Sequence, residues 1–233
     1  GYYAQFRYGR NYKFISPRAE ALGEALCVIF GIADEARAKQ VVASTPVTSF
    51  GISCIYPQIP NIPPYHNNAV WPFVQTYWLW AAAKAGNERS VSESIFAIYR
   101  PAALFLTNKE NFVVDNGDFN GTQINSSVML WSLSGNISIV QKVFFGVRFN
   151  PDGLSFEPFV PKILEGKRML ENFKYRDAVL NIELEGYGNV IKSFLLDGKL
   201  QRQASVPASL KGNHTIKIIL ANNTNGFYDV NKV

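Results

Sequence analysis

The sequence predicts an α+β protein of two parts, a helical part over residues 1–146 and a small antiparallel β domain over residues 147–233. Before Gly146, apolar residues recur every three or four positions, which is the spacing of helices. After it, short stretches alternate between polar and apolar residues, as strands do. With 47% hydrophobic and 18% charged residues among 233, the chain can build a core in each part.

Charge and composition narrow the classes of function. The net charge of +5 comes from Lys and Arg residues scattered along the chain, so we expect no nucleic-acid partner. No apolar run approaches the ~18–20 residues of a membrane span, and no membrane partner is expected. Two cysteines and two histidines without metal-binding spacing predict no metal site, and the lack of a glycine-rich phosphate loop predicts no cofactor.

The first two helices are predicted from their ends. Ser16-Pro17 places a capping hydroxyl before a proline at the first helical position, and Gly31 stops the apolar face that follows. Asp34 can cap a second, short helix that runs through Val42. We therefore expect one helix between Ser16 and Gly31 and another between Asp34 and Val42.

A proline-rich loop separates these helices from a very apolar one. Its prolines are Pro46, Pro57, Pro60, Pro63 and Pro64. They exclude a helix there, and long ordered loops in compact domains are often functional. The next helix, over about 69–85, is apolar nearly all round, so we expect it to be buried on several sides before Gly86-Asn87 ends it. The remaining helices are predicted over about 88–106 and 126–145, with a turn-rich segment over 107–122.

Strand signals fill the second part. The candidate strands cover residues 154–160, 168–175, 178–183, 190–196 and 214–220. Asp197-Gly198 is typical of a two-residue hairpin turn, which would join Leu196 to Lys199. We therefore expect a small antiparallel β domain, appended to the helical part.

Three short elements resemble a known family. Residues 65–72 read YHNNAVWP, residues 109–112 read KENF, and residues 130–132 read LWS. The passage from Phe145 to Pro161 is similar to the way the last barrel helix leads into a C-terminal β domain in that family. Together these elements resemble the six-hairpin, (α/α)6-toroid glycoside hydrolase superfamily, and most of all its α-glucosidase and debranching-like branches.

The resemblance implies a partial toroid of about five helices, followed by a small antiparallel β-sandwich-like domain. A full toroid needs six helical hairpins, so the chain corresponds to roughly the last half. Half a toroid leaves large apolar helix faces uncovered, and such faces are seldom left bare. We expect a second chain or copy to cover the open half, an oligosaccharide or glycoside as substrate, and a periplasmic or secreted location.

The resemblance also implies a catalytic role for Glu110, which matches the general base of inverting members. In such an enzyme Glu110 takes a proton from water, while an acid on the opposite face, absent from any motif here, protonates the leaving oxygen. The alternative is an ordinary surface carboxylate following Lys109. Accordingly the chain is either a glycosidase or a non-catalytic, carbohydrate-binding or structural remnant that lacks the general acid.

The remaining site residues are expected to bind substrate: Tyr65, His66, Asn67, Trp71, Trp131, Arg18 and Glu20. Trp71 and Trp131 can stack on apolar sugar faces, or else belong to the core. His66 either contacts a sugar hydroxyl or caps the helix and packs the loop. Arg18 and Glu20 either form an ion pair at the helix start, which we favour, or bind sugar hydroxyls.

Overall fold

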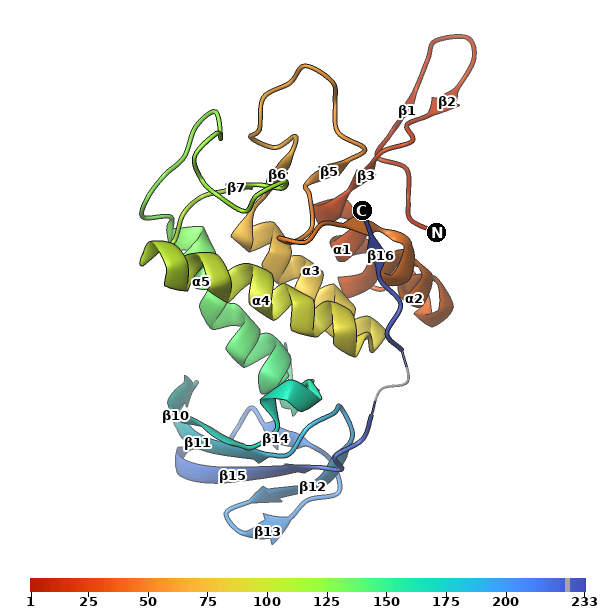
Figure 1. Cartoon of the computed structure of the whole chain (residues 1–233). Coiled ribbons are helices and arrows are strands. Elements are labelled where there is room, and N and C mark those ends of the chain that lie inside the picture. Colours follow the sequence, from red (N-terminus) through yellow and green to blue (C-terminus); the bar gives the residue numbers. More distant parts are fainter. Residues whose placement is uncertain (225–226) are drawn as a thin grey trace. The chain divides into compact units, whose positions relative to one another are not determined.

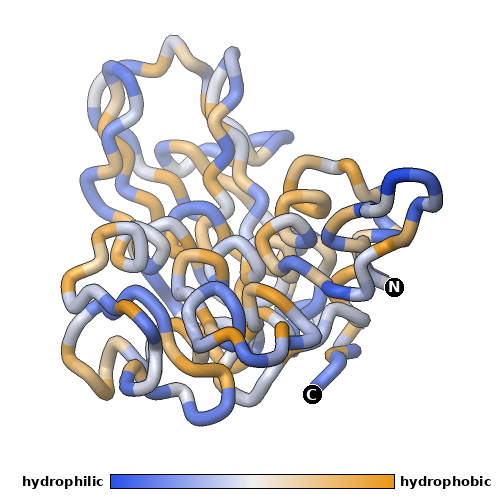
Figure 2. Tube along the Cα trace, turned by 90° about the horizontal axis from the view of Figure 1, so that it is seen from above, coloured by the Kyte–Doolittle hydropathy of each residue, from blue (hydrophilic) through white to orange (hydrophobic). Residues whose placement is uncertain are grey.

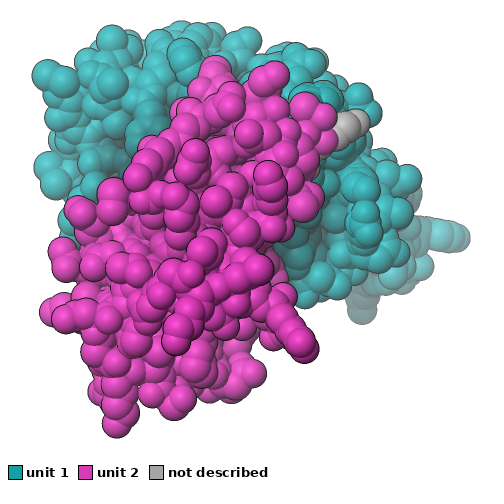
Figure 3. Space-filling model, turned by 90° about the horizontal axis from the view of Figure 1, so that it is seen from below, with its two compact units in different colours: residues 1–139, 226–233 teal, residues 140–225 magenta. Residues whose placement is uncertain are grey.

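The computed structural model describes residues 1–224 and 227–233, so residues 225 and 226 of the predicted β domain lie outside the described residues. The chain forms two compact units, coloured separately in Figure 3. The first contains residues 1–139 and 227–233, and the second contains residues 140–224. The α-helices lie in the first unit and the longer strands in the second, which confirms the predicted α+β class.

Among the described residues of the first unit, five helices pack together (Figure 1). They are α1 (Ala21–Ile29), α2 (Glu35–Ser44), α3 (Pro72–Ala85), α4 (Glu88–Phe105) and α5 (Leu130–Ile139). Helix α3 is central, because it packs against each of the other four. Ten of its 14 residues are buried, as expected for a helix that is apolar nearly all round. None of the helices described here is both long and apolar enough to cross a membrane.

Helix ends that depend on local capping lie where the sequence predicts them. The Asp34 side chain accepts a hydrogen bond from the Arg37 N–H at the start of α2. Helix α3 ends at Gly86, whose left-handed φ of 78° suits glycine. Asn87 then caps α4 by accepting from the Ser90 N–H. The changes in hydropathy along the chain can be followed in Figure 2.

Three helices begin later than the sequence predicts. The first starts at Ala21 rather than at Ser16, because Ala19–Glu20 (β3) pairs with Ile55–Tyr56 (β5). The next starts at Pro72 rather than at about residue 69, because Ala69–Val70 (β6) pairs with Phe112–Val113 (β7). The last starts at Leu130 instead of Ser126, and after Ile139 its turns become π-helical over Val140–Phe144.

Further short strands complete the first unit. Arg7–Tyr8 (β1) and Phe14–Ile15 (β2) form a hairpin. Pro46–Val47 (β4) pairs in parallel with Asn231–Lys232 (β16). Residues 227–233 therefore belong to the helical unit, whereas the sequence predicts all of residues 147–233 in the β domain.

The described part of the second unit, residues 140–224, contains two sheets. The larger has the order β10 (Lys167–Tyr175), β11 (Ala178–Glu185), β15 (Gly212–Leu220), β12 (Ile191–Leu196), β13 (Lys199–Leu200). The smaller has the order β14 (Ser205–Pro207), β9 (Gly153–Phe156), β8 (Val147–Asn150), and a 3-10 turn covers Lys162–Leu164. Strands β11 and β15 run parallel, so the sheet is mixed, and the prediction of a purely antiparallel domain is wrong.

One core is shared by the two sheets. Leu154, Phe156 and Val206 of the smaller sheet belong to the same buried cluster as Leu180 and Ile216 of the larger. The predicted turn between β12 and β13 is present, with φ values of 49° at Asp197 and 75° at Gly198.

We predict that Asn87→Ala lowers the free energy of unfolding by about 2 kcal/mol, measured by urea titration. Asn87 is fully buried, and besides capping α4 its amide donates a 2.7 Å hydrogen bond to the Asp229 carbonyl, which the variant leaves unsatisfied. Asp34→Ala is the matched control, since it removes one exposed cap and is expected to cost about 1 kcal/mol. Equal losses would contradict this account.

Candidate functional site

A hollow of about 330 Å³ lies where three helices begin. It is lined by Glu20, Leu22, Cys54, Ile55, His66, Trp71, Phe73, Val74 and Trp131. Glu20 and Leu22 stand at the start of α1, Trp71 and Phe73 at the start of α3, and Trp131 in the first turn of α5. We call this space the aromatic hollow.

Short strand pairs hold these helix starts together. Strand β3 pairs with β5, which places Glu20 opposite Ile55. The Cys54 N–H donates to the Ala69 carbonyl, so the same segment is bound to β6. Strand β6 in turn pairs with β7, with Val70 opposite Phe112. A continuous set of backbone hydrogen bonds therefore runs from the start of α1, through the start of α3, to the segment that carries Glu110.

Rings in mutual contact form the wall of the aromatic hollow. Phe73 and Trp131 stack with centroids 4.4 Å apart and planes 16° apart. Trp71 stacks on His66 at 5.0 Å and meets Trp131 edge to face at 5.7 Å. Trp71 is buried, with its indole N–H donating to the Tyr65 carbonyl, whereas Trp131 is 43% exposed. Trp131 and His66 are therefore the rings available to a ligand, and Trp71 supports them.

Glu110 is buried beside the aromatic hollow without lining it. It lies just before β7, and not at a helix start, and is only 7% exposed. One carboxylate oxygen accepts from the Tyr65 hydroxyl at 3.2 Å, and the other from the Ser126 N–H at 3.1 Å. Partial burial, and then the Glu110 charge, raise the pKa of Tyr65, which therefore stays a protonated donor at neutral pH.

Asn67 and Arg18 contact the backbone of the proline-rich loop. Asn67 is buried, and its amide accepts from the Ile59 N–H and donates to the Ile59 and Ile62 carbonyls. The Arg18 guanidinium donates to the Pro57 carbonyl at 3.1 Å. Both side chains hold the loop in place, so neither has its polar group directed to the aromatic hollow.

The prediction of an ion pair between Arg18 and Glu20 is wrong. In the described part of the chain the two side chains form separate contacts, because Glu20 caps α1. Its carboxylate accepts from the N–H groups of Leu22 and Gly23, the shorter bond being 2.7 Å. Strand pairing at β3 moves the helix start to Ala21, and this makes Glu20 the capping residue.

The aromatic hollow also contains residues that the sequence analysis missed as site residues. Phe73 stacks on Trp131, and Cys54 lies in the wall. Burial raises the pKa of the Cys54 thiol to about 12, so it acts as a small apolar side chain and not as a nucleophile. Phe73 lies in the first turn of the helix that Trp71 precedes, and this position in the sequence could have predicted Phe73 as a site residue. Among the residues described, no group of three or more His, Cys, Asp or Glu side chains could hold a metal ion.

No protein family model matches the chain, and a search of curated proteins returned no match.

A buried carboxyl group lies one helical turn beyond Glu20. Glu24 is 2% exposed, and burial raises its pKa to about 7, with a smaller contribution from the Glu20 charge. A hydrogen bond from the Tyr3 backbone and the charge of Arg37 act in the opposite direction. At acid pH Glu24 is therefore neutral in the folded protein, while in the unfolded chain it ionises above its ordinary value of 4.5.

We predict that Glu24→Gln stabilises the protein at pH 8 and has little effect near pH 4. Between pH 4.5 and about 7 the unfolded wild-type chain has lost the Glu24 proton and the folded protein keeps it, so stability falls as pH rises. Urea titrations across this range should show the difference between variant and wild type growing, then levelling above pH 7. Glu35→Gln is the control, because Lys39 lowers the pKa of the exposed Glu35. A growing difference there as well would contradict the assignment to Glu24.

Proposed function

We propose that this chain is the C-terminal part of an inverting glycoside hydrolase of the (α/α)6 type. The observation that carries the proposal is the convergence of the starts of α1, α3 and α5 on one aromatic hollow, with a buried carboxylate beside it. Rings with exposed faces suit the apolar faces of pyranoses, and a nearby carboxylate suits the activation of water.

The packing order of the helices supports the toroidal part of this proposal. Helix α3 packs against α1 and α5, while α2 and α4 connect these helices along the chain and also pack on α3. In a toroid of helical hairpins, alternate helices form the inner ring and the others the outer ring. Helices α1, α3 and α5 would then be inner helices, and the two sheets with their shared core would be the β-sandwich-like domain.

Glu110 is the general base in this proposal. Each of its carboxylate oxygens accepts one protein hydrogen bond, which leaves lone pairs for a water molecule. Tyr65 and the Ser126 N–H orient the carboxylate, and Glu110 takes the proton of a water that attacks the sugar. The general acid comes from a segment other than those described, at the ~6.5–9.5 Å separation of inverting pairs.

The second candidate function is carbohydrate binding without hydrolysis. It is favoured by the complete engagement of Asn67 and by the helix-capping role of Glu20, because both leave fewer polar groups for chemistry in the aromatic hollow. Sugar affinity without turnover would support this alternative.

We predict that Glu110→Gln lowers turnover by about two to four orders of magnitude and spares sugar affinity, because it removes the base and preserves the shape. Turnover is measured on α-linked glucose disaccharides, in the assembly that includes the segment supplying the acid, and NMR identifies the anomer first released. Inversion of the anomeric configuration is the expected outcome.

Trp131→Ala is the matched contrast, since it removes an exposed ring from the aromatic hollow and leaves Glu110 in place. We expect sugar affinity to weaken about two- to tenfold in this variant. Unchanged turnover in Glu110→Gln would remove Glu110 from the mechanism, and unchanged affinity in Trp131→Ala would remove the aromatic hollow as the binding site.

We also propose that a second chain, or a second copy of this one, covers the open half of the toroid. Exposed apolar side chains support this: Leu104, Leu106, Val128, Leu130, Leu133 and Ile137. Leu104 lies on α4 and Leu130, Leu133 and Ile137 lie on α5, while Leu106 follows α4 and Val128 precedes α5. An exposed apolar set of this size is rarely left uncovered. Sedimentation velocity should show an assembly larger than one chain of 26.1 kDa, and Leu130→Glu should shift it toward the monomer. A monomer at all concentrations would exclude a second copy of this chain as the cover.

A further inference from the structure

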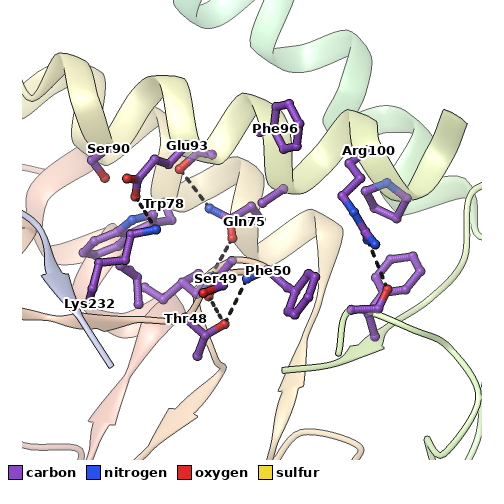
Figure 4. A pocket seen from close by; sticks show the side chains of 18 residues that line it. Thr48, Ser49, Phe50, Gln75, Trp78, Ser90, Glu93, Phe96, Arg100 and Lys232 are labelled. Atoms are coloured by element: carbon purple, nitrogen blue, oxygen red, sulfur yellow. Dashed lines mark hydrogen bonds and ion pairs between the residues drawn. The ribbon is translucent and has the colours of Figure 1, made fainter. Parts of the chain in front are cut away.

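A second hollow, of about 150 Å³, lies between α4 and the loop over residues 47–51 (Figure 4). Helix α3 contributes Gln75 and Trp78 to its wall, and α4 contributes Glu93, Ala97 and Arg100. It shares no lining residue with the aromatic hollow. We call this space the α4 hollow.

Most polar groups deep in the α4 hollow already have protein partners. Gln75 is 2% exposed, and its amide oxygen accepts from the Ile52 N–H at 2.7 Å while its nitrogen donates to the Ser94 hydroxyl at 2.8 Å. The Thr48 hydroxyl donates to the Gly51 carbonyl. Because these polar groups are already bonded to the protein, a ligand would be recognised by the charged side chains of the α4 hollow.

At one end of the α4 hollow the charges are paired. The Glu93 carboxylate contacts Lys232 at 3.1 Å and is also bonded to Arg89 at 3.1 Å. A single carboxylate thus serves two cations, and Figure 4 shows the pair of Glu93 and Lys232 side by side. This end therefore has no spare negative charge to offer to the rest of the hollow.

At the other end stands Arg100, whose side chain extends from α4 toward the turn that contains Gly117 (Figure 4). Its guanidinium lies 5.1 Å from the centre of the Phe50 ring and donates a long, 3.4 Å hydrogen bond to the Gly117 carbonyl. Gly117 has a φ of 67°, and a Cβ atom there would lie 2.4 Å from the Phe50 ring. Glycine thus lets the turn approach both side chains closely.

Within the described residues, no carboxylate lies within ion-pair distance of Arg100. The neighbouring turn contains Asp115 and Asp118, but their carboxylates accept hydrogen bonds from Asn68 and from the Asn120 N–H. Arg100 is partly buried, and a guanidinium in such a place favours a bidentate carboxylate partner.

We propose that the α4 hollow binds a small carboxylate attached to a six-membered ring. A cavity of about 150 Å³ holds one benzene-sized ring. The ring would lie among Ala97, Ile52 and the Phe50 side chain, and the carboxylate would meet the Arg100 fork. An aromatic acid and a hexuronate share this chemistry, and they differ in the hydroxyl groups that the hexuronate ring carries.

Isothermal titration of the whole chain with benzoate and glucuronate tests the proposal, with benzyl alcohol and glucose as neutral counterparts. At least one of the two acids should bind with about tenfold or higher affinity than its neutral counterpart. Charge-assisted hydrogen bonds to Arg100 contribute at least the binding free energy that this ratio requires. Binding of benzoate alone assigns an aromatic acid, and binding of glucuronate alone assigns a hexuronate. In NMR spectra the Gly117 and Ser94 amide signals should shift with the bound acid.

Arg100→Gln should reduce the carboxylate affinity about tenfold or more. Arg7→Gln in the exposed strand β1 should leave it unchanged, because Arg7 does not line the α4 hollow. If Arg100→Gln fails to fold, the comparison of charged and neutral ligands on the wild-type protein still tests the proposal. The proposal is overturned if neither acid binds, if the neutral compounds bind equally well, or if a folded Arg100→Gln keeps full affinity.

Discussion

The first unit depends on a line of backbone hydrogen bonds between very short strands. Strand β3 pairs with β5, Cys54 bonds to Ala69, and β6 pairs with β7. Each pair contributes few bonds, but together they fix the starts of α1 and α3 and the segment that carries Glu110 relative to one another. The geometry of the aromatic hollow follows from this constraint, because its walls are the side chains at those starts.

The same constraint determines the surroundings of Glu110. Pairing of β6 with β7 brings residues 69–70 beside residues 112–113, and Tyr65 thereby reaches the carboxylate at 3.2 Å. Burial without hydrogen bonds would be costly for a carboxylate, and the Tyr65 hydroxyl and Ser126 N–H offset that cost. In Glu24 the second oxygen has no partner in the described part of the chain, and burial raises the pKa of this carboxyl group to about 7.

The two hollows of the helical unit differ in what they offer a ligand. The aromatic hollow presents stacked rings and an adjacent carboxylate, which suits a neutral, hydroxylated ring. The α4 hollow presents a guanidinium beside a phenyl ring, which suits an acid. Central helix α3 lines both of them, so its buried residues support two chemically distinct walls.

Sequence alone determined the features that depend on neighbouring residues. Asp34, Gly86 and Asn87 mark helix ends because capping is local, and Asp197-Gly198 turns a hairpin because it tolerates positive φ. The family resemblance brought His66, Trp71 and Trp131 together as candidates, and they do line one hollow. Only the tertiary structure decided the late starts of α1 and α3, the loop-holding role of Asn67 and the parallel pairing of β11 with β15. Those depend on residues distant along the chain, and two-residue strands are too short to leave a periodic pattern.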